Sequence, residues 1–246
     1  MIIRGNISRG GVEIQKAALP RRVRGFSLIE MLVVIAVIGI LAGILLGAMP
    51  AIQEKRIRSQ VRAELRNLIT AIEAYKEKHG FYPPDNPDTA NAARAIAQPP
   101  LFYELVGTKV GANPVQFIPL DGAPTITPAQ VNNNFGSDGF MNSAPEAAEV
   151  KNFYTTAKTN KHYVASPFVS GADQGRIMVL RVPAKGPTVS SFPAAAADLN
   201  TWRYIVAKPR KGPNDRYPTN NPTSYDLWAD VTIRGRTVTI GNWKEE

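Results

Sequence analysis

Residues 24–49 read RGFSLIEMLVVIAVIGILAGILLGAM, and beyond Arg24 the only ionisable side chain in this stretch is Glu30. The segment from Phe26 to Met49 is long enough for one membrane crossing, which takes about 20 residues. A charge near the end of a membrane-spanning helix costs free energy unless it finds a partner. Glu30 therefore calls for a functional explanation.

The formal net charge of +9 is concentrated before the apolar stretch. Residues 1–25 contain six basic side chains and one acidic side chain: Arg4, Arg9, Lys16, Arg21, Arg22, Arg24 and Glu13. A basic segment before an apolar span keeps its own side cytoplasmic and sends the following residues across the membrane. Nucleic acid could also attract these charges, but no recognition motif accompanies them, so no nucleic-acid partner is expected.

A candidate cleavage site, the Gly25-Phe26 step, precedes the apolar segment. An ordinary secretory signal is cut after its apolar core, whereas the Gly25-Phe26 step comes before it. Residues 25–42, GFSLIEMLVVIAVIGILA, resemble the processing and methylation segment of type IV pilins and type II secretion pseudopilins. The resemblance implies that a prepilin peptidase removes residues 1–25 as a leader and that Phe26 becomes the N-methylated first residue.

By the same resemblance, Glu30 serves filament assembly. Cleavage creates an α-amine on Phe26, and a carboxylate about one helical turn later can neutralise it within one chain or on a neighbouring subunit. A pair between subunits would set the axial register of a filament. The alternative is that Glu30 only snorkels to the membrane interface.

The helix is expected to continue beyond the span 26–49 as an amphipathic segment over residues 50–79. Apolar side chains recur there every three or four residues as a single stripe: Ile57, Val61, Leu65, Leu68, Ile72 and Tyr75. His79 is expected to be a terminal helix residue rather than a metal ligand, because Gly80 provides a stop. Residues 26–79 would then form one helix of about 80 Å.

Residues 80–246 are expected to form a periplasmic globular domain with a variable middle over 80–175. Short helical pieces are predicted over 90–97 and 101–105. Residues 107–145 are rich in Gly, Pro, Asn and Asp and are interpreted as a long loop or insertion.

Strand signals gather in the C-terminal part, 176–246. Apolar runs over 176–182 and 201–207 and a hairpin turning at 234–236 predict an antiparallel sheet of three to five strands on the N-terminal helix. The predicted fold class is α+β and pilin-like.

Two C-terminal stretches sharpen the resemblance. Residues 225–228 (YDLW) and 240–243 (IGNW) look like the closing segments of the major pseudopilin of type II secretion. In that family the loop between them often binds calcium. Here it offers Asp230 beside Arg234 and Arg236, and calcium prefers six to eight oxygen ligands. The calcium site is therefore predicted to be lost, and no cofactor is expected.

An enzyme is not expected. The sequence contains no glycine-rich phosphate loop, nucleophile elbow or His-Glu metal motif, and cysteine is absent. Four aromatic residues in the C-terminal part could form a carbohydrate platform, but their strand patterns favour a place in the core: Trp202, Tyr204, Trp228 and Trp243.

The sequence thus predicts a structural pseudopilin subunit that polymerises into a short periplasmic filament driving type II secretion. Expected partners are further copies, minor pseudopilins, the prepilin peptidase, the inner-membrane assembly platform and membrane lipids. The expected location is the bacterial inner membrane, single-pass, with a cytoplasmic N-terminus. A type IV pilin for adhesion, motility or DNA uptake, and a membrane-tethered binding domain with a pilin-like anchor, remain open alternatives.

Overall fold

The computed structural model describes residues 25–88, 91–187, 199–208 and 218–243, and the basic leader, residues 1–24, lies outside these ranges. The chain divides into two compact units, Met1–Met49 and Pro50–Glu246. We describe them separately as the first and the second unit. Together their elements have the predicted α+β class.

Helix α1 (Leu28–His79) has 52 residues and includes Pro50. In the first unit, every residue from Gly25 to Leu45 is exposed. Helix α1 is the one helix in the described chain that is long and apolar enough to cross a membrane. It ends where predicted, because Gly80 adopts a φ of 82°, which L side chains rarely adopt, and its N–H donates to the Lys76 carbonyl at 2.8 Å.

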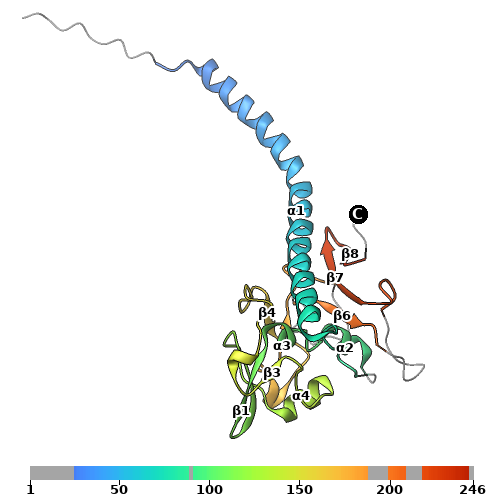
Figure 1. The fold of residues 1–246 in the computed structure, drawn as a ribbon. Helices are drawn as coiled ribbons and strands as arrows, with labels where there is room; N and C mark the ends of the chain where they lie inside the picture. The colour runs from blue at the N-terminus through green and yellow to red at the C-terminus, as the bar shows by residue number, and fades with distance from the viewer. Residues whose placement is uncertain (1–24, 89–90, 188–198, 209–217, 244–246) are drawn as a thin grey trace, which may run out of the picture. The chain divides into compact units, whose positions relative to one another are not determined.

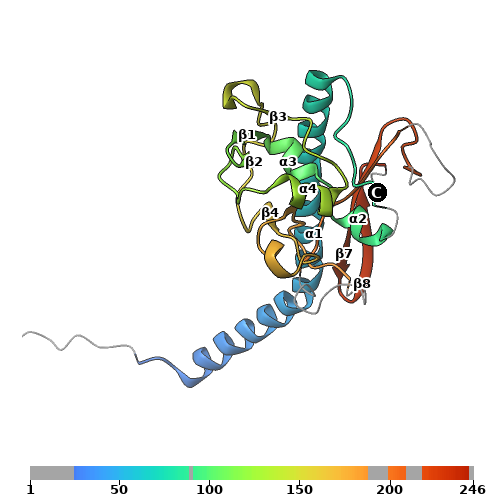
Figure 2. The same cartoon turned by 90° about the horizontal axis from the view of Figure 1, so that it is seen from below.

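The second unit packs its core against one stripe of α1. The predicted stripe is confirmed: Val61, Leu65, Leu68, Ile72 and Tyr75 are buried, and Ile57 packs against the same core. Figures 1 and 2 show β7 and β8 on one side of this part of α1, and α3, β1 and β3 on the other. The amphipathic half of α1 is therefore the central element of the second unit.

The middle of the chain holds short elements in close succession. They are α2 (Ala92–Ala97), α3 (Leu101–Val106), β1 (Thr108–Ala112), β2 (Val115–Pro119), α4 (Pro128–Phe135), β3 (Ser143–Ala144) and the single turn η1 (Ala147–Glu149). The two helical pieces predicted before residue 106 are confirmed.

The prediction of a long irregular loop over 107–145 was wrong. Strands β1 and β2 pair antiparallel, β3 adds to β1 in parallel, and α4 lies between β2 and β3 in the chain. The strands were missed because they have at most five residues and contain Gly111 and Pro119. A signal for α4 was present: Thr127 and Gln130 form a capping box, with Pro128 at the first helical position.

The C-terminal sheet has the order β6-β7-β8, formed by β6 (Arg203–Val206), β7 (Tyr225–Ile233) and β8 (Arg236–Gly241). The predicted hairpin is confirmed, and its turn places both Arg234 and Gly235 at positive φ. Residues 225, 227, 229, 231 and 233 of β7 are buried, so this face of the sheet contributes to the core.

The strand predicted over 176–182 does not join that sheet as a full strand. The part that forms a strand, β5 (Met178–Leu180), pairs with β4 (Tyr163–Ala165), and the turn η2 (Gly171–Asp173) lies between them in the chain. A single antiparallel bridge between Arg181 and Thr201 links it to the residues before β6. The expectation of one sheet is corrected to three small ones.

Candidate functional site

The predicted cleavage step lies in an exposed, non-helical segment just before α1. Gly25 and Phe26 precede the first helical residue, Leu28, and Phe26 is 72% exposed. A Cβ built on Gly25 would meet no atom within 4 Å. Packing in the described structure therefore does not require glycine at this position.

The Glu30 carboxylate lies at the N-terminus of α1. Its Oε2 accepts the backbone N–H of Ser27 at 2.9 Å, and Met31 N–H donates to the Ser27 carbonyl at 3.2 Å. A carboxylate in the first turn is favoured by the helix dipole and by the unpaired N–H groups there. The structure thus brings Glu30 to the helix end that follows Phe26, and it also gives Glu30 a local partner.

Asp230, the residue considered as a calcium ligand, already uses both carboxylate oxygens in hydrogen bonds. One carboxylate oxygen accepts from Arg203 on β6, and the other accepts the Thr239 hydroxyl on β8 at 2.6 Å. Asp230 thereby links all three strands of the C-terminal sheet. No group of three or more His, Cys, Asp or Glu side chains suited to a metal occurs among the described residues.

Asp226 organises the start of β7. It is buried and accepts the backbone N–H groups of Thr219, Asn220 and Asn221 at 2.9 to 3.0 Å. Asn242, next to Trp243, accepts the Leu227 N–H at 3.0 Å. The two stretches that carry the C-terminal resemblance are therefore joined by hydrogen bonds in the fold.

The four aromatic residues considered for a carbohydrate platform differ in burial. Trp202 and Tyr204 are in the core, as predicted. Trp228 and Trp243 are only half-buried and meet edge to face with ring centroids 5.8 Å apart. The assignment of these two residues to the core was wrong, because β7 alternates and residue 228 belongs to its outer face.

A buried polar cluster on α1 was not predicted. Glu64, a charged residue beside the apolar stripe of α1, is only 7% exposed and accepts the Tyr154 hydroxyl. His162 Nε2 lies 3.9 Å from Glu64 Oε2, and its Nδ1 is buried without a hydrogen-bond partner among the described atoms. His79 ends α1 and contacts the Tyr75 ring at 4.4 Å between centroids.

We expect the stability of the second unit to fall as the pH falls below about 6.5, the usual pKa of histidine. Burial lowers the pKa of His162 despite the opposing charge of Glu64, and Lys161 and Lys158 lower it further. Burial also lowers the pKa of His79. As the pH falls, these two histidines therefore bind protons in the unfolded chain before they do so in the folded one. Their contribution to stability is present above pH 6.5 and is lost progressively below it.

Urea unfolding at pH 7.5 and 5.5 would measure this effect through tryptophan fluorescence, because all three tryptophans belong to the second unit. His162→Gln should reduce the difference between the two midpoints, and adding His79→Gln should reduce it further. If the stability of the wild type and that of the double variant depended equally on pH, the pH dependence could not be assigned to His162 and His79.

A family model matches the N-terminal part of the chain, and three relatives match about a quarter to a third of its length. Residues 20–46 match the family model of the prokaryotic N-terminal methylation motif. The chain is 39% identical over 67 residues to the type IV major pilin protein PilE1 of Neisseria gonorrhoeae, covering 26% of this chain and 30% of that protein. It is 32% identical over 78 residues to the type II secretion system core protein G of Escherichia coli, covering 32% of this chain and 54% of that protein.

A third relative is the fimbrial protein EcpC of Eikenella corrodens, 43% identical over 74 residues, covering 28% of this chain and 46% of that protein. The chain thus spans between 30% and 54% of the lengths of these three relatives. No solved structure matches it. The methylation motif and the apolar half of α1 together indicate a membrane-anchored protein.

Proposed function

We propose that this type IV pilin-like protein is a structural pseudopilin subunit, which polymerises into a short periplasmic filament that drives type II secretion. The observation that carries the proposal is the methylation motif over residues 20–46, combined with an exposed Gly25-Phe26 step directly before α1. A prepilin peptidase cuts between these two residues, and the new terminus at Phe26 is N-methylated. The subunit acts by assembly and is not an enzyme.

The proposed role of Glu30 follows from the charge that cleavage creates. Before cleavage the nitrogen of Phe26 is an uncharged amide, and afterwards it is an ammonium group. In a filament of packed apolar helices, this ammonium and the Glu30 carboxylate lie in a low-dielectric environment where each needs an opposite charge. A pair formed between neighbouring subunits would fix their axial register.

The proposed location is the bacterial inner membrane, with a single pass through residues 26–49. The basic residues of the leader support a cytoplasmic N-terminus and a periplasmic C-terminal domain. The proposed partners are other copies of the chain, minor pseudopilins, the prepilin peptidase, the assembly platform and membrane lipids. No nucleic-acid partner is proposed.

A type IV pilin is the second candidate function, favoured by the similarity to the PilE1 pilin. The resemblance of residues 225–243 to the major pseudopilin and the similarity to the core protein G favour secretion. Deleting the gene in its own host would separate the two functions. A secretion subunit predicts that secreted proteins accumulate in the periplasm while surface pili persist, whereas a pilin predicts loss of pili with secretion unchanged. If the deletion changed neither secretion nor surface pili, a membrane-tethered binding domain would be favoured.

We also propose that the C-terminal hairpin replaces a calcium site. The turn between β7 and β8 is short, and its arginines repel a cation. Asp230 already neutralises Arg203, so its oxygens are not available without breaking an ion pair. Isothermal titration of the full-length protein in detergent should detect no calcium binding at micromolar concentrations. Micromolar binding would contradict this proposal.

A further inference from the structure

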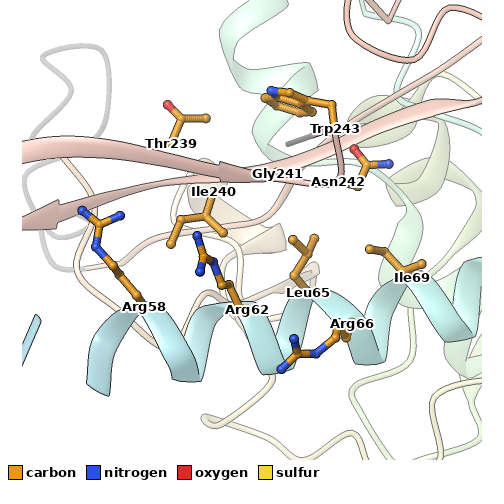
Figure 3. A pocket seen from close by; sticks show the side chains of 10 residues that line it. All are labelled: Arg58, Arg62, Leu65, Arg66, Ile69, Thr239, Ile240, Gly241, Asn242 and Trp243. Carbon is orange, nitrogen blue, oxygen red and sulfur yellow. The ribbon is translucent and has the colours of Figure 1, made fainter. Parts of the chain in front are cut away.

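A groove with a basic rim lies between α1 and β8 in the second unit. Its volume is about 470 Å³, within the usual range of small-ligand pockets. Figure 3 shows Arg58 and Arg62 extending from α1 toward β8. Leu65 and Ile240, which also line the groove, are buried apolar side chains. The groove therefore combines guanidinium groups with an apolar wall, which suits an amphiphilic anion.

The hairpin between β7 and β8 adds positive charge at one end of this groove. Figure 3 shows β8 and α1 running in the same direction, with Thr239 toward the Arg58 end. Arg236 precedes Thr239 by three residues, or about 10 Å of strand. The exposed turn residues Arg234 and Arg236 therefore lie beyond Arg58, at the end of the second unit that begins with Pro50.

The positive charge at this end is only partly neutralised. Glu54 accepts hydrogen bonds from Nε and Nη2 of Arg58 at 3.2 and 3.0 Å. A guanidinium has five N–H groups, so this pair leaves three of them for other acceptors. Lys55, Arg234 and Arg236 are exposed and make no ion pair with any residue that the structure describes. We call the following side chains the basic end: Lys55, Arg58, Arg62, Arg234 and Arg236.

The basic end belongs to a segment with an unusual charge for its place in the chain. Residues 50–66 contain five basic and two acidic side chains: Lys55, Arg56, Arg58, Arg62, Arg66, Glu54 and Glu64. In the proposed topology they follow the span on the translocated side, whereas Lys and Arg are normally enriched on the cytoplasmic side. Arg58 follows Pro50 by eight residues, at most about 30 Å even for a fully extended chain. The chain length thus keeps the basic end within reach of the membrane surface.

We propose that the basic end binds the phosphate groups of anionic phospholipids in the leaflet on the translocated side, with Arg58 and Arg62 holding one headgroup in the groove. This inference deepens the proposed function and rests on its single pass through residues 26–49. Guanidinium groups match the geometry of phosphate oxygens. Each basic side chain near an anionic membrane surface strengthens binding by about fivefold. The contact holds the second unit at the membrane surface before assembly.

Photo-cross-linking of the full-length chain in lipid vesicles tests this contact. The vesicles contain phosphatidylglycerol and phosphatidylcholine, and in two separate preparations one or the other lipid carries a photoreactive headgroup. Mass spectrometry of the digested protein should find phosphatidylglycerol adducts on residues 55–62 and 234–240 at least about tenfold more often than phosphatidylcholine adducts. Equal labelling by the two lipids would show proximity to the membrane without recognition of the anion and would overturn the site. Absence of adducts from these residues would overturn it as well.

Paired substitutions separate the charge of the basic end from the charge of the whole protein. Arg58→Gln with Arg236→Gln should reduce the phosphatidylglycerol adducts at least about fivefold. The matched control, Lys78→Gln with Lys151→Gln, removes two exposed charges that do not line the groove, and it should be labelled as the wild type is. Arg58→Lys with Arg236→Lys keeps both charges and should stay within about twofold of the wild type, which separates loss of charge from loss of fold. Unchanged labelling of the glutamine pair, or an equal reduction in the lysine control, would overturn the site.

Excess inorganic phosphate at constant ionic strength distinguishes a lipid headgroup from a free phosphate. The adducts should persist, because several basic side chains contact headgroups that the membrane holds together. Loss of the adducts would assign the groove to soluble phosphate and overturn the lipid site. The measurement requires no filaments, so absence of filaments from the wild-type protein in its own host would refute the proposed function without removing the lipid contact.

Discussion

Replacing Glu30 by alanine is expected to abolish filament assembly while leaving cleavage after Gly25 intact. The proposed cleavage acts on the exposed Gly25-Phe26 step, which precedes α1, and the Glu30 carboxylate contacts Ser27 and not this step. Assembly of the Glu30→Ala variant, in contrast, would place the Phe26 ammonium among packed apolar helices without an opposite charge. Breaking a buried ion pair in this way costs about 3–5 kcal/mol, a factor of more than a hundred in association.

The measurement is filament yield by electron microscopy, together with the mass of the processed subunit from the same membranes. Glu30→Gln is the informative companion, because it keeps the size and the hydrogen bond to Ser27 but removes the charge. It should fail to assemble as Glu30→Ala does. Normal filaments from Glu30→Gln would mean that the helix-capping bond matters and that the proposed charge pair does not.

Replacing Glu104 by alanine is expected to destabilise the second unit by at least about 3 kcal/mol. Glu104 lies on α3, is 1% exposed and accepts three hydrogen bonds. The donors are the Tyr75 hydroxyl at 2.9 Å and the backbone N–H groups of Met141 and Asn142 at 2.9 and 3.0 Å. Alanine would leave the buried Tyr75 and Asn142 donors and the partly buried Met141 donor without an acceptor, at about 1–3 kcal/mol for each buried donor.

Urea unfolding of the full-length protein, followed by tryptophan fluorescence, would give the change in the free energy of unfolding. Glu146→Ala is a suitable control, because Glu146 is exposed and makes no ion pair with another described residue. It should change stability by less than about 0.5 kcal/mol. A similarly small effect of Glu104→Ala would show that this network does not hold α1 to the loop before β3.

Local signals in the sequence were enough to predict α1 and the C-terminal hairpin. The apolar stripe from Ile57 to Tyr75 and the stop at Gly80 are contained in the helix itself, and the turn at Arg234-Gly235 joins adjacent strands. The residues of the candidate site could also be proposed from the sequence, because Gly25, Phe26 and Glu30 lie in one contiguous motif.

The features that were missed depend on residues far apart in the chain. Glu64 carries a charge, which favours solvent, and its hydrogen-bond partner in the interior, Tyr154, follows it by 90 residues. The donors to the Glu104 carboxylate are 29 to 38 residues away in the chain. Strands β1, β2 and β3 are too short for a periodic pattern to identify, and their pairing is set by tertiary packing.

The central claim is that the chain is a prepilin that matures at the Gly25-Phe26 step. Mass spectrometry of the N-terminal peptide from protein made in its own host tests this claim most directly. The account predicts a mature chain that begins with N-methylated Phe26 and retains Glu30 four residues later. An intact leader, or a cut beyond Met49 that removes the apolar segment, would contradict it.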